Sequence, residues 1–209
     1  REVINGNKIG VLPIPTKPGH TFLGWNTEID GTGISITKDT IITSSIRYYA
    51  QWNEIETMFD QGSVVNVKLK YLSGSLSDNT DTSNWATRDN NITSIERTTT
   101  SPDTSTMTND NIISVSGSKY PIYAWFENAK IYWYTDADIA YANPNSSNMF
   151  AYFESARSID TSFDTSLVVN ASFMLSSNGV TSYDVSGFNT SNMTDMNHMF
   201  YYKQNLTAS

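Results

Sequence analysis

The sequence predicts an α+β chain that is mostly β: a small β module, a cap that contains a β-hairpin, and the start of a solenoid. The solenoid is predicted by a 25-residue period, because the pairs Met149-Phe150, Met174-Leu175 and Met199-Phe200 recur at a constant step. A period in this range indicates a short structural unit that stacks on copies of itself. The β module is predicted by short aromatic runs between proline- and glycine-rich turns in the first 53 residues.

Changes in composition divide the 209 residues into three predicted regions. Residues 1–53 form the β module, residues 54–145 form a connector and N-terminal cap, and residues 146–209 form the repeats. The chain begins at Arg1 and stops inside a repeat at Ser209. We therefore expect a fragment of a longer protein, with any signal peptide or anchor outside it.

The composition excludes several classes of function. The net charge is −8 and no run of Lys or Arg occurs, which argues against nucleic acid or an anionic membrane as a partner. Cysteine is absent, so disulfides, thiolate metal sites and a cysteine nucleophile are excluded. No apolar stretch approaches the roughly 20 residues that cross a bilayer, so we expect no membrane insertion. Ser and Thr together number 52 and Asn 21, which favours a β-rich, secreted bacterial protein.

The β module follows from turn and strand signals. Prolines hold residues 13–18 extended, with a turn predicted at Pro18-Gly19. Residues 21–25 form a short aromatic strand, and Asp30-Gly31 is a strong turn signal. Residues 46–51 alternate apolar and polar side chains, the period of a half-buried strand.

These residues resemble the Listeria–Bacteroides repeat, the internalin B-repeat family, whose pattern is P-x-x-x-G-Y-T-F-x-G-W, a glycine turn, then L-Y-A-x-W. The resemblance implies a β-grasp-like module of the kind used in tandem in bacterial surface proteins. His20 stands where the family has Tyr, and the strand expected before Val3 is missing, so we expect an exposed strand edge. Trp25 and Trp52 are expected to close a small core rather than to form a sugar-stacking platform.

The connector begins with an ambiguous apolar segment. Its residues 65–76 fit one face of a helix and fit a strand equally well, and we favour a helix of two to three turns that ends near Gly74. A short strand is predicted at 91–96. The Ser- and Thr-rich segment 98–111 is predicted to be a mobile loop.

A β-hairpin is predicted where two apolar runs, 121–126 and 130–135, flank residues 127–129. It stands where the exposed end of a solenoid needs a cap. The segment also resembles the leader that precedes leucine-rich-like repeats in many Gram-positive surface proteins. On such a hairpin one face packs while the other shows Tyr132 and Tyr134 to solvent.

The candidate ligand-binding residues are therefore aromatic. Packing of the core and cap is the leading interpretation of this cluster, and contact with a glycan or protein is the alternative. An outward Tyr183 in the repeats would likewise favour binding over a purely structural role. The candidate residues are Trp125, Tyr132, Tyr134 and Tyr183.

Within the repeats, Met193, Met196, Met199 and Phe200 fall at helical spacing and are expected to face inward. The first copy places Val168, Ala171, Met174 and Leu175 at the matching positions. The segment resembles the repeat L-x-x-L-D-x-S-x-F-D-T-S-x-V-T-x-M-x-x-M-F of BspA-like leucine-rich-repeat proteins. The resemblance implies adhesion, aggregation or host contact, and it names no ligand.

The chain is not expected to be an enzyme. It has two histidines and lacks the phosphate-loop, HExxH and Gly-x-Ser-x-Gly motifs. Asp160, Asp164 and Asp184 are predicted to hold turns rather than to act as catalytic groups or metal ligands. We expect neither a cofactor nor a metal site.

Together these features predict a non-catalytic, adhesin-like fragment of a bacterial cell-surface protein. It is expected to be extracellular, monomeric and anchored to the cell wall or a lipid through segments outside it. Its partner would be a surface protein or glycan of the host or of a neighbouring cell. The alternatives are a structural stalk that presents a binding region elsewhere, and an accessory module of a carbohydrate-active enzyme.

Overall fold

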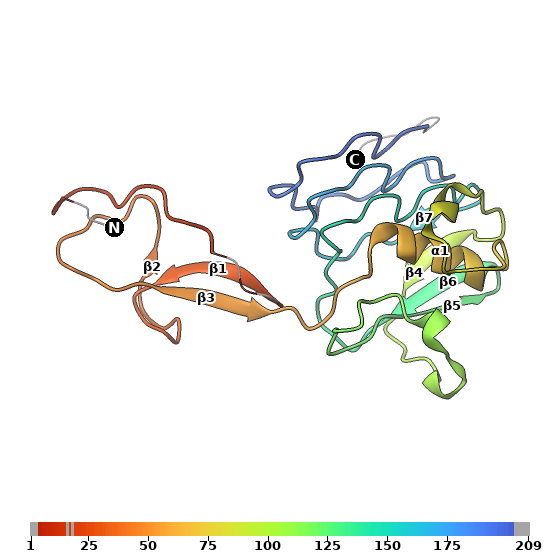
Figure 1. Ribbon diagram of the computed structural model, residues 1–209, viewed down its shortest axis with the longest axis horizontal. Helices are drawn as coiled ribbons and strands as arrows, with labels where there is room; N and C mark the ends of the chain where they lie inside the picture. The colour runs from red at the N-terminus through yellow and green to blue at the C-terminus, as the bar shows by residue number, and fades with distance from the viewer. Residues whose placement is uncertain (1–3, 16, 18, 203–209) are drawn as a thin grey trace. The chain divides into compact units, whose positions relative to one another are not determined.

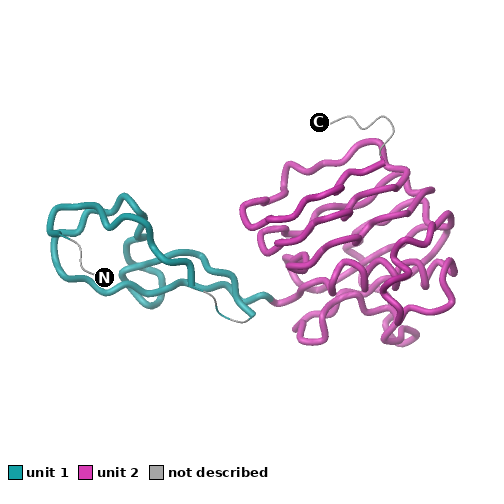
Figure 2. The backbone as a smooth tube through the Cα atoms, turned by 45° about the horizontal axis from the view of Figure 1, so that its top comes forward, with its two compact units in different colours: residues 1–55 teal, residues 56–209 magenta. Residues whose placement is uncertain are grey.

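The computed structural model describes residues 4–15, 17 and 19–202, and the chain forms two compact units, residues 1–55 and 56–209 (Figure 2). One α-helix and short strands give an α+β fold that is mostly β, as the sequence predicts. The connector and the repeats lie in one unit. The elements (Figure 1) are β1 (His20–Asn26), β2 (Ser35–Ile36), β3 (Tyr49–Glu54), α1 (Gly62–Leu72), η1 (Thr82–Ala86), β4 (Ser94–Arg97), η2 (Thr104–Thr106), η3 (Asn109–Asn111), β5 (Tyr123–Glu127), β6 (Lys130–Tyr134) and β7 (Ser158–Ile159).

The N-terminal unit contains an antiparallel sheet with the strand order β2-β1-β3. The predicted strand at 21–25 is confirmed as part of β1. The strand predicted at 46–51 is misplaced, because β3 begins at Tyr49 and runs to Glu54. Pairing with β1 ends at Asn26↔Tyr49, so the residues before Tyr49 have no partner in β1, and Ile46 is exposed.

The tryptophans of this unit flank a phenylalanine rather than close a core. Phe22 packs edge-on against Trp25 and Trp52, with ring centroids 5.6 and 5.5 Å apart, and both indoles remain half-buried. The side chains with the least exposure are instead Ile9, Asn26 and Ile36. The expectation of a core closed by the two tryptophans is therefore wrong.

The C-terminal unit contains a second sheet with the order β5-β6-β4-β7. Strands β5 and β6 form the predicted hairpin, whose turn residues Asn128 and Ala129 have φ of 51° and 62°, as two-residue hairpin turns favour. Strand β4 pairs in parallel with both β6 and β7. Strand β4 therefore lies between the hairpin and β7, which belongs to the first repeat.

From residue 141 onward the chain winds in coils that stack on one another (Figures 1 and 2). Parallel bridges join Asn145 to Asn170 and Asn170 to Asp195, in step with the period of the sequence. The inward side chains of the first copy are confirmed, since all four predicted positions are fully buried. These residues are Val168, Ala171, Met174 and Leu175.

The second copy departs from its predicted helix. Residues 190–202 contain turns and no helix. Met199 is buried, but Met196 is 49 % and Phe200 37 % exposed. A helix is broken there because His198 has a left-handed φ of 57°. The expectation that Met196 and Phe200 face inward is therefore wrong.

Two sets of backbone hydrogen bonds join the coils. In one set the later coil donates to the earlier one: the N–H groups of Thr194 and Asp195 donate to the carbonyl of Val169. The larger set runs the other way. The backbone N–H groups of four alternate residues of the first coil donate to carbonyls of the next coil, over 2.8 to 3.3 Å. The second coil donates to the third coil in the same way. The pairs are Ser146–Asn170, Asn148–Ser172, Phe150–Met174 and Tyr152–Ser176, then Ala171–Asp195, Phe173–Asn197, Leu175–Met199 and Ser177–Tyr201.

This direction differs from that of a β-strand, in which a residue offers N–H and C=O to the same neighbour. Here the carbonyl of a donating residue turns back into its own coil: Ser146 accepts from the N–H of Met149, and Asn148 accepts from that of Ala151. Left-handed residues recur at equivalent positions of successive coils and allow these turns. They are Asn148, Phe173 and His198, and Tyr152, Ser177 and Tyr202.

Helix α1 covers the carbonyl side of the first coil. The N–H of Gly62 donates to the carbonyl of Asn145 (2.8 Å), and the Asn66 amide donates to those of Asn148 (2.9 Å) and Ala151 (3.0 Å). The two donors are one turn apart, about 6 Å along the helix. The predicted helix is thus confirmed. It covers the edge of the first coil, where the sequence analysis expects the hairpin to form the cap.

Candidate functional site

The predicted aromatic face lies on the hairpin. Trp125 on β5 is in register with Tyr132 on β6, and their rings stack with centroids 5.7 Å apart and planes 29° from parallel. Both side chains are half-buried, whereas Ile131 and Trp133 on the other face are buried. The structure therefore brings two of the four candidate residues into direct contact.

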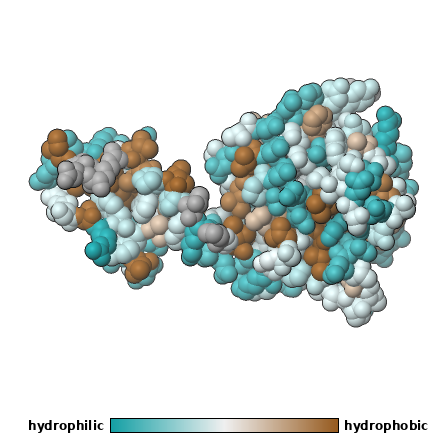
Figure 3. Space-filling view, viewed as in Figure 1, coloured by the Kyte–Doolittle hydropathy of each residue, from teal (hydrophilic) through white to brown (hydrophobic). Residues whose placement is uncertain are grey.

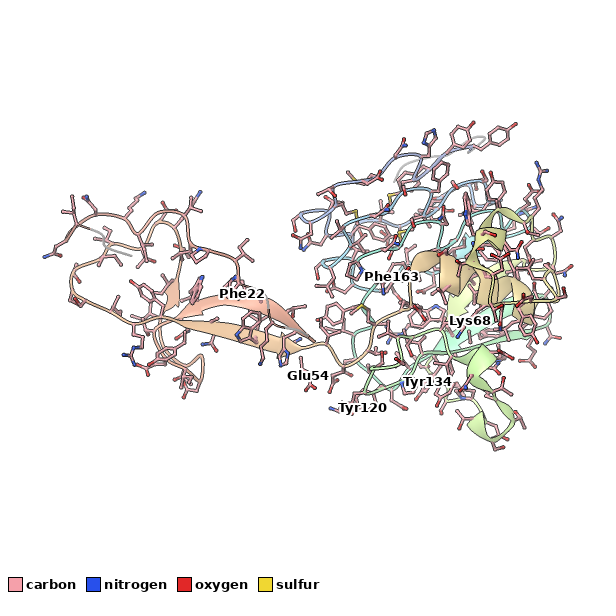
Figure 4. All side chains as sticks on the ribbon, in the orientation of Figure 1. Phe22, Glu54, Lys68, Tyr120, Tyr134 and Phe163 are labelled. Carbon is pink, nitrogen blue, oxygen red and sulfur yellow. The ribbon has the colours of Figure 1, made fainter. Side chains whose placement is uncertain are left out.

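Tyr134, which Figure 4 labels, extends this face, and Tyr123 lies opposite it. The Tyr134 hydroxyl donates to the Asp136 carboxylate over 2.6 Å, and this bond raises the pKa of the tyrosine. Tyr123 was missed because the predicted face was built from β6 with only one residue of β5. Cross-strand pairing alone could have identified it.

The fourth candidate, Tyr183, is not on the surface. Its side chain is 5 % exposed, and its hydroxyl donates to Oδ1 of Asn178 over 2.6 Å. Burial raises the pKa of this hydroxyl. The ring belongs to the core between the coils, so Tyr183 does not face outward and the structure does not support it as a ligand-binding residue.

A shallow cleft of about 480 Å³ lies beside Trp125. Its second wall comes from the loop 102–111, which was predicted to be mobile and which contains η2 and η3. Asp103 caps η2 by accepting the N–H of Ser105 over 3.0 Å. The lining residues are Pro102, Asp103, Thr106, Met107, Asn111, Trp125 and Glu127. An indole flanked by carboxylates, a hydroxyl and an amide is suited to a ligand with one apolar face and several hydroxyl groups.

A second aromatic row lies on the coils and was not predicted. Trp85 contacts Tyr152 and Phe173 with centroids 5.8 and 5.9 Å apart, and Phe173 stacks on His198 at 4.8 Å with planes 4° from parallel. The signal available in the sequence was that Phe173 and His198 occupy equivalent positions of successive repeats. Phe173 contacts three rings, those of Trp85, His198 and Tyr201, so this row is suited to packing more than to binding.

The aspartates of the repeats hold turns, as predicted. Asp160, Asp164 and Asp184 each accept the N–H of the serine two positions further on, over 2.7 to 3.0 Å. Asn170 and Asn189 do the same at their own positions. Among the residues that the structure describes, no three His, Asp or Glu side chains are arranged to hold a metal ion.

The N-terminal unit carries an open groove of about 970 Å³, lined mainly by aliphatic and aromatic side chains including Ile9, Trp25 and Ile42. Its surface shows several brown patches (Figure 3). The exposed aliphatic residues are Ile4, Val11, Ile14, Leu23, Ile29, Ile34, Ile41 and Ile46. This surface is apolar, and it lacks the carboxylates that flank Trp125.

None of the helices in the described part of the chain has the length and apolar character needed to span a bilayer. Comparison with known proteins gives two family matches. Residues 1–51 match the model of the Listeria-Bacteroides repeat domain, and residues 122–209 match that of a family described as Mycoplasma protein of unknown function, DUF285. No curated protein and no solved structure matches the chain. The N-terminal unit is thus similar to a Listeria-Bacteroides repeat, and the two matches together indicate a surface-associated repeat protein.

Proposed function

We propose that this chain is a non-catalytic, adhesin-like part of a bacterial cell-surface protein, and that the Trp125 cleft contacts a glycan. The stacked Trp125–Tyr132 pair beside this cleft is the observation that carries the proposal. The similarity of residues 1–51 to a repeat domain of surface proteins supports the location.

In this proposal, residues 1–53 are a β-grasp-like module and residues 146–209 begin a leucine-rich-like solenoid of the BspA-like type. The regular step of the coil-to-coil bridges supports the solenoid. Module and solenoid lie outside the cell, held through other segments of the full-length protein. The solenoid lies in the same compact unit as the cleft.

The chemistry of the cleft favours a glycan over an anionic partner. The exposed face of the Trp125 indole packs against the apolar face of a sugar ring, while Asp103 and Glu127 accept hydrogen bonds from sugar hydroxyls. The chain has a net charge of −8, which repels polyanions. A neutral oligosaccharide is therefore the proposed ligand.

Binding of the chain to a glycan array and to a panel of extracellular-matrix proteins tests this proposal. We expect glycan binding that is lost in the variant Trp125→Ala/Tyr132→Ala and kept in Tyr202→Ala, which removes a ring that is 70 % exposed outside the hairpin. Binding that survives in the hairpin variant would place the contact elsewhere. The absence of any binding by the parent would favour the stalk, in which the chain presents a binding region that lies outside it.

A further inference from the structure

The loop that forms the second wall of the Trp125 cleft is anchored to the hairpin at both ends. The N–H of Thr98, just after β4, donates to the carbonyl of Trp133 on β6 over 2.9 Å. The side-chain amide of Asn111, in η3, donates to the carbonyl of Ala124 on β5, also over 2.9 Å. Ala124 and Trp133 are a cross-strand pair, so the loop leaves one rung of the hairpin and returns to that same rung.

Each end of the loop has further support. At the first end, the Ser101 hydroxyl interacts with that of Tyr134 on β6. At the second end, Lys68 on α1, which Figure 4 labels, donates to the carbonyls of Asn109 (3.3 Å) and Ile112 (2.5 Å). The two ends of the loop are therefore fixed to the hairpin and the helix.

The middle of the loop, residues 102–107, has no such support, and we call it the flap. In the part of the chain that the structure describes, the flap residues make hydrogen bonds only with one another. The Asp103 carboxylate accepts the N–H of Ser105, and the N–H of Met107 donates to the carbonyl of Thr104 over 3.2 Å. Residues 103–106 are exposed, and the loop projects from the body of the unit beside β5 (Figure 1).

The cleft therefore has one fixed wall and one movable wall. Trp125 and Glu127 belong to β5, and Asn111 belongs to the anchored end of the loop. A segment that has few buried contacts and only local hydrogen bonds opens at a low free energy. Movement of the flap changes the width of the cleft while the indole stays in place. The lining residues that move with the flap are Pro102, Asp103, Thr106 and Met107.

We propose that the flap is a lid for the Trp125 cleft, which swings about its anchored ends and controls access to the indole. Asp103 and Thr106 move with the flap, so a ligand on Trp125 is enclosed when the flap closes. Surface loops whose ends lie close together often carry function in this way. The role of the lid rests on the proposed glycan contact, but its motion can be measured on the chain alone.

Hydrogen exchange of the chain without added glycan measures this motion. The N–H of Thr98 is an anchor and is expected to be protected, as is that of Ile113, which donates to the carbonyl of Ile122 over 2.9 Å. The amides of residues 104–107 are expected to exchange at least about tenfold faster than these two. Equal protection of the flap and its anchors would overturn the lid.

The variant Asn111→Asp loosens one anchor with little change in shape. Its Oδ1 still accepts the N–H of Thr108, while the donor to the Ala124 carbonyl is lost. We expect labelling of Trp125 by hydroxyl radicals, measured by mass spectrometry, to rise about fivefold, the effect of losing one hydrogen bond. Asn109→Asp is the matched control, because it adds the same charge in the same turn and breaks no hydrogen bond among the described residues. Its labelling should equal that of the parent.

Trp133, which is buried on the other face of the hairpin, reports on unfolding in the same experiment. Equal labelling of Trp125 in Asn111→Asp and Asn109→Asp, with Trp133 unlabelled, would overturn the lid. If Trp133 is labelled as well, the variant is unfolded, and the exchange rates of the parent decide.

These measurements also separate the lid from the proposed function. A flap that opens in a chain that binds no glycan on the array supports the lid and overturns the glycan contact. Glycan binding by a chain whose flap is as protected as its anchors overturns the lid and supports the contact.

Discussion

Asn66 and Lys70, one turn apart on α1, donate hydrogen bonds to the same acceptor, the carbonyl oxygen of Ala151, each over 3.0 Å. Lys70 also donates to the carbonyl of Trp85, so one buried ammonium joins the helix, the first coil and η1. A buried amine needs such acceptors because it has lost its water. The arrangement makes α1 part of the coil stack rather than a helix that merely lies against it.

The first prediction concerns pH and Lys70. Burial lowers the pKa of Lys70 from 10.5 to about 7, and the charge of Asp89 acts in the opposite direction. Between these two values the unfolded chain binds one proton more than the folded chain, so the free energy of unfolding rises with pH, by at most about 1.4 kcal/mol per unit. Below pH 7 this slope disappears. Urea denaturation at pH 6.5, 8 and 9.5 measures it, and Lys70→Met should remove it; equal slopes in parent and variant would contradict the prediction.

The second prediction concerns Asp89, which is fully buried. Its carboxylate accepts the N–H groups of Asn91 and Ile92 and the hydroxyls of Ser73 and Ser75. Asp89→Ala leaves these donors unpaired and should lower the free energy of unfolding by about 3 kcal/mol. Asp78→Ala is the control.

Asp78 holds a similar turn on the surface, where it accepts the N–H and hydroxyl of Thr80. Its removal should change the free energy of unfolding by less than about 0.5 kcal/mol, because water replaces the lost partner. Thermal or chemical denaturation of both variants measures the difference. Similar losses of unfolding free energy in Asp89→Ala and Asp78→Ala would show that Asp89 is not buried.

The third prediction compares two methionines of one coil. Met199 is 6 % exposed, so Met199→Asp should cost several kcal/mol, roughly 3 to 5, because it buries an unpaired charge. Met196→Asp places the same charge on a side chain that is 49 % exposed and should cost less than about 0.5 kcal/mol. Denaturation curves distinguish them, and a helix with both residues inward would give two large losses.

The fourth prediction concerns Gly62 at the start of α1. Alanine is the better helix former by about 1 kcal/mol, so propensity alone favours Gly62→Ala. The added Cβ would lie 2.3 Å from the Ser147 carbonyl oxygen, in backbone that cannot move without disturbing the coil. We therefore expect Gly62→Ala to lower the melting temperature, whereas Gly187→Ala, which meets no atom within 4 Å, should leave it almost unchanged. An increase in the melting temperature of Gly62→Ala would show that α1 does not contact the coil.

Local signals predicted the hairpin well, because its turn and both of its strands are contiguous in sequence. The neighbours of that hairpin were not predictable in the same way. Strand β4 lies between β6 and β7, both of which come much later in the chain, and its Ser94 is in register with Lys130 and Ser158. Parallel pairings of this kind leave no turn signal in the sequence.

The misplaced side chains share one cause. Met196 and Phe200 were placed by helical periodicity, but each coil turns at left-handed residues that are not glycine. Glycine normally marks such positions. At His198 and Tyr202 the sequence carries no such mark, so the direction of the neighbouring side chains could not be predicted.

The hairpin side of the candidate site could be predicted from the sequence, and the loop side could not. Trp125, Tyr132 and Tyr134 were identified from their density on one hairpin face. The second wall of the cleft, with Asp103 and Thr106, comes from a segment without periodicity. Its position depends on side-chain caps of short 3₁₀ turns, which sequence patterns describe poorly.

The repeating hydrogen bonds between coils have a consequence for how such a protein can change in length. The rows 146–152 and 171–177 each present N–H groups to the next coil, and the carbonyls on the opposite side of the first coil face α1, so inserting or deleting a whole repeat leaves the surface under α1 chemically the same. The cap need not be altered when the number of units changes. Duplication and loss of units can therefore adjust the reach of the protein while the cap stays intact.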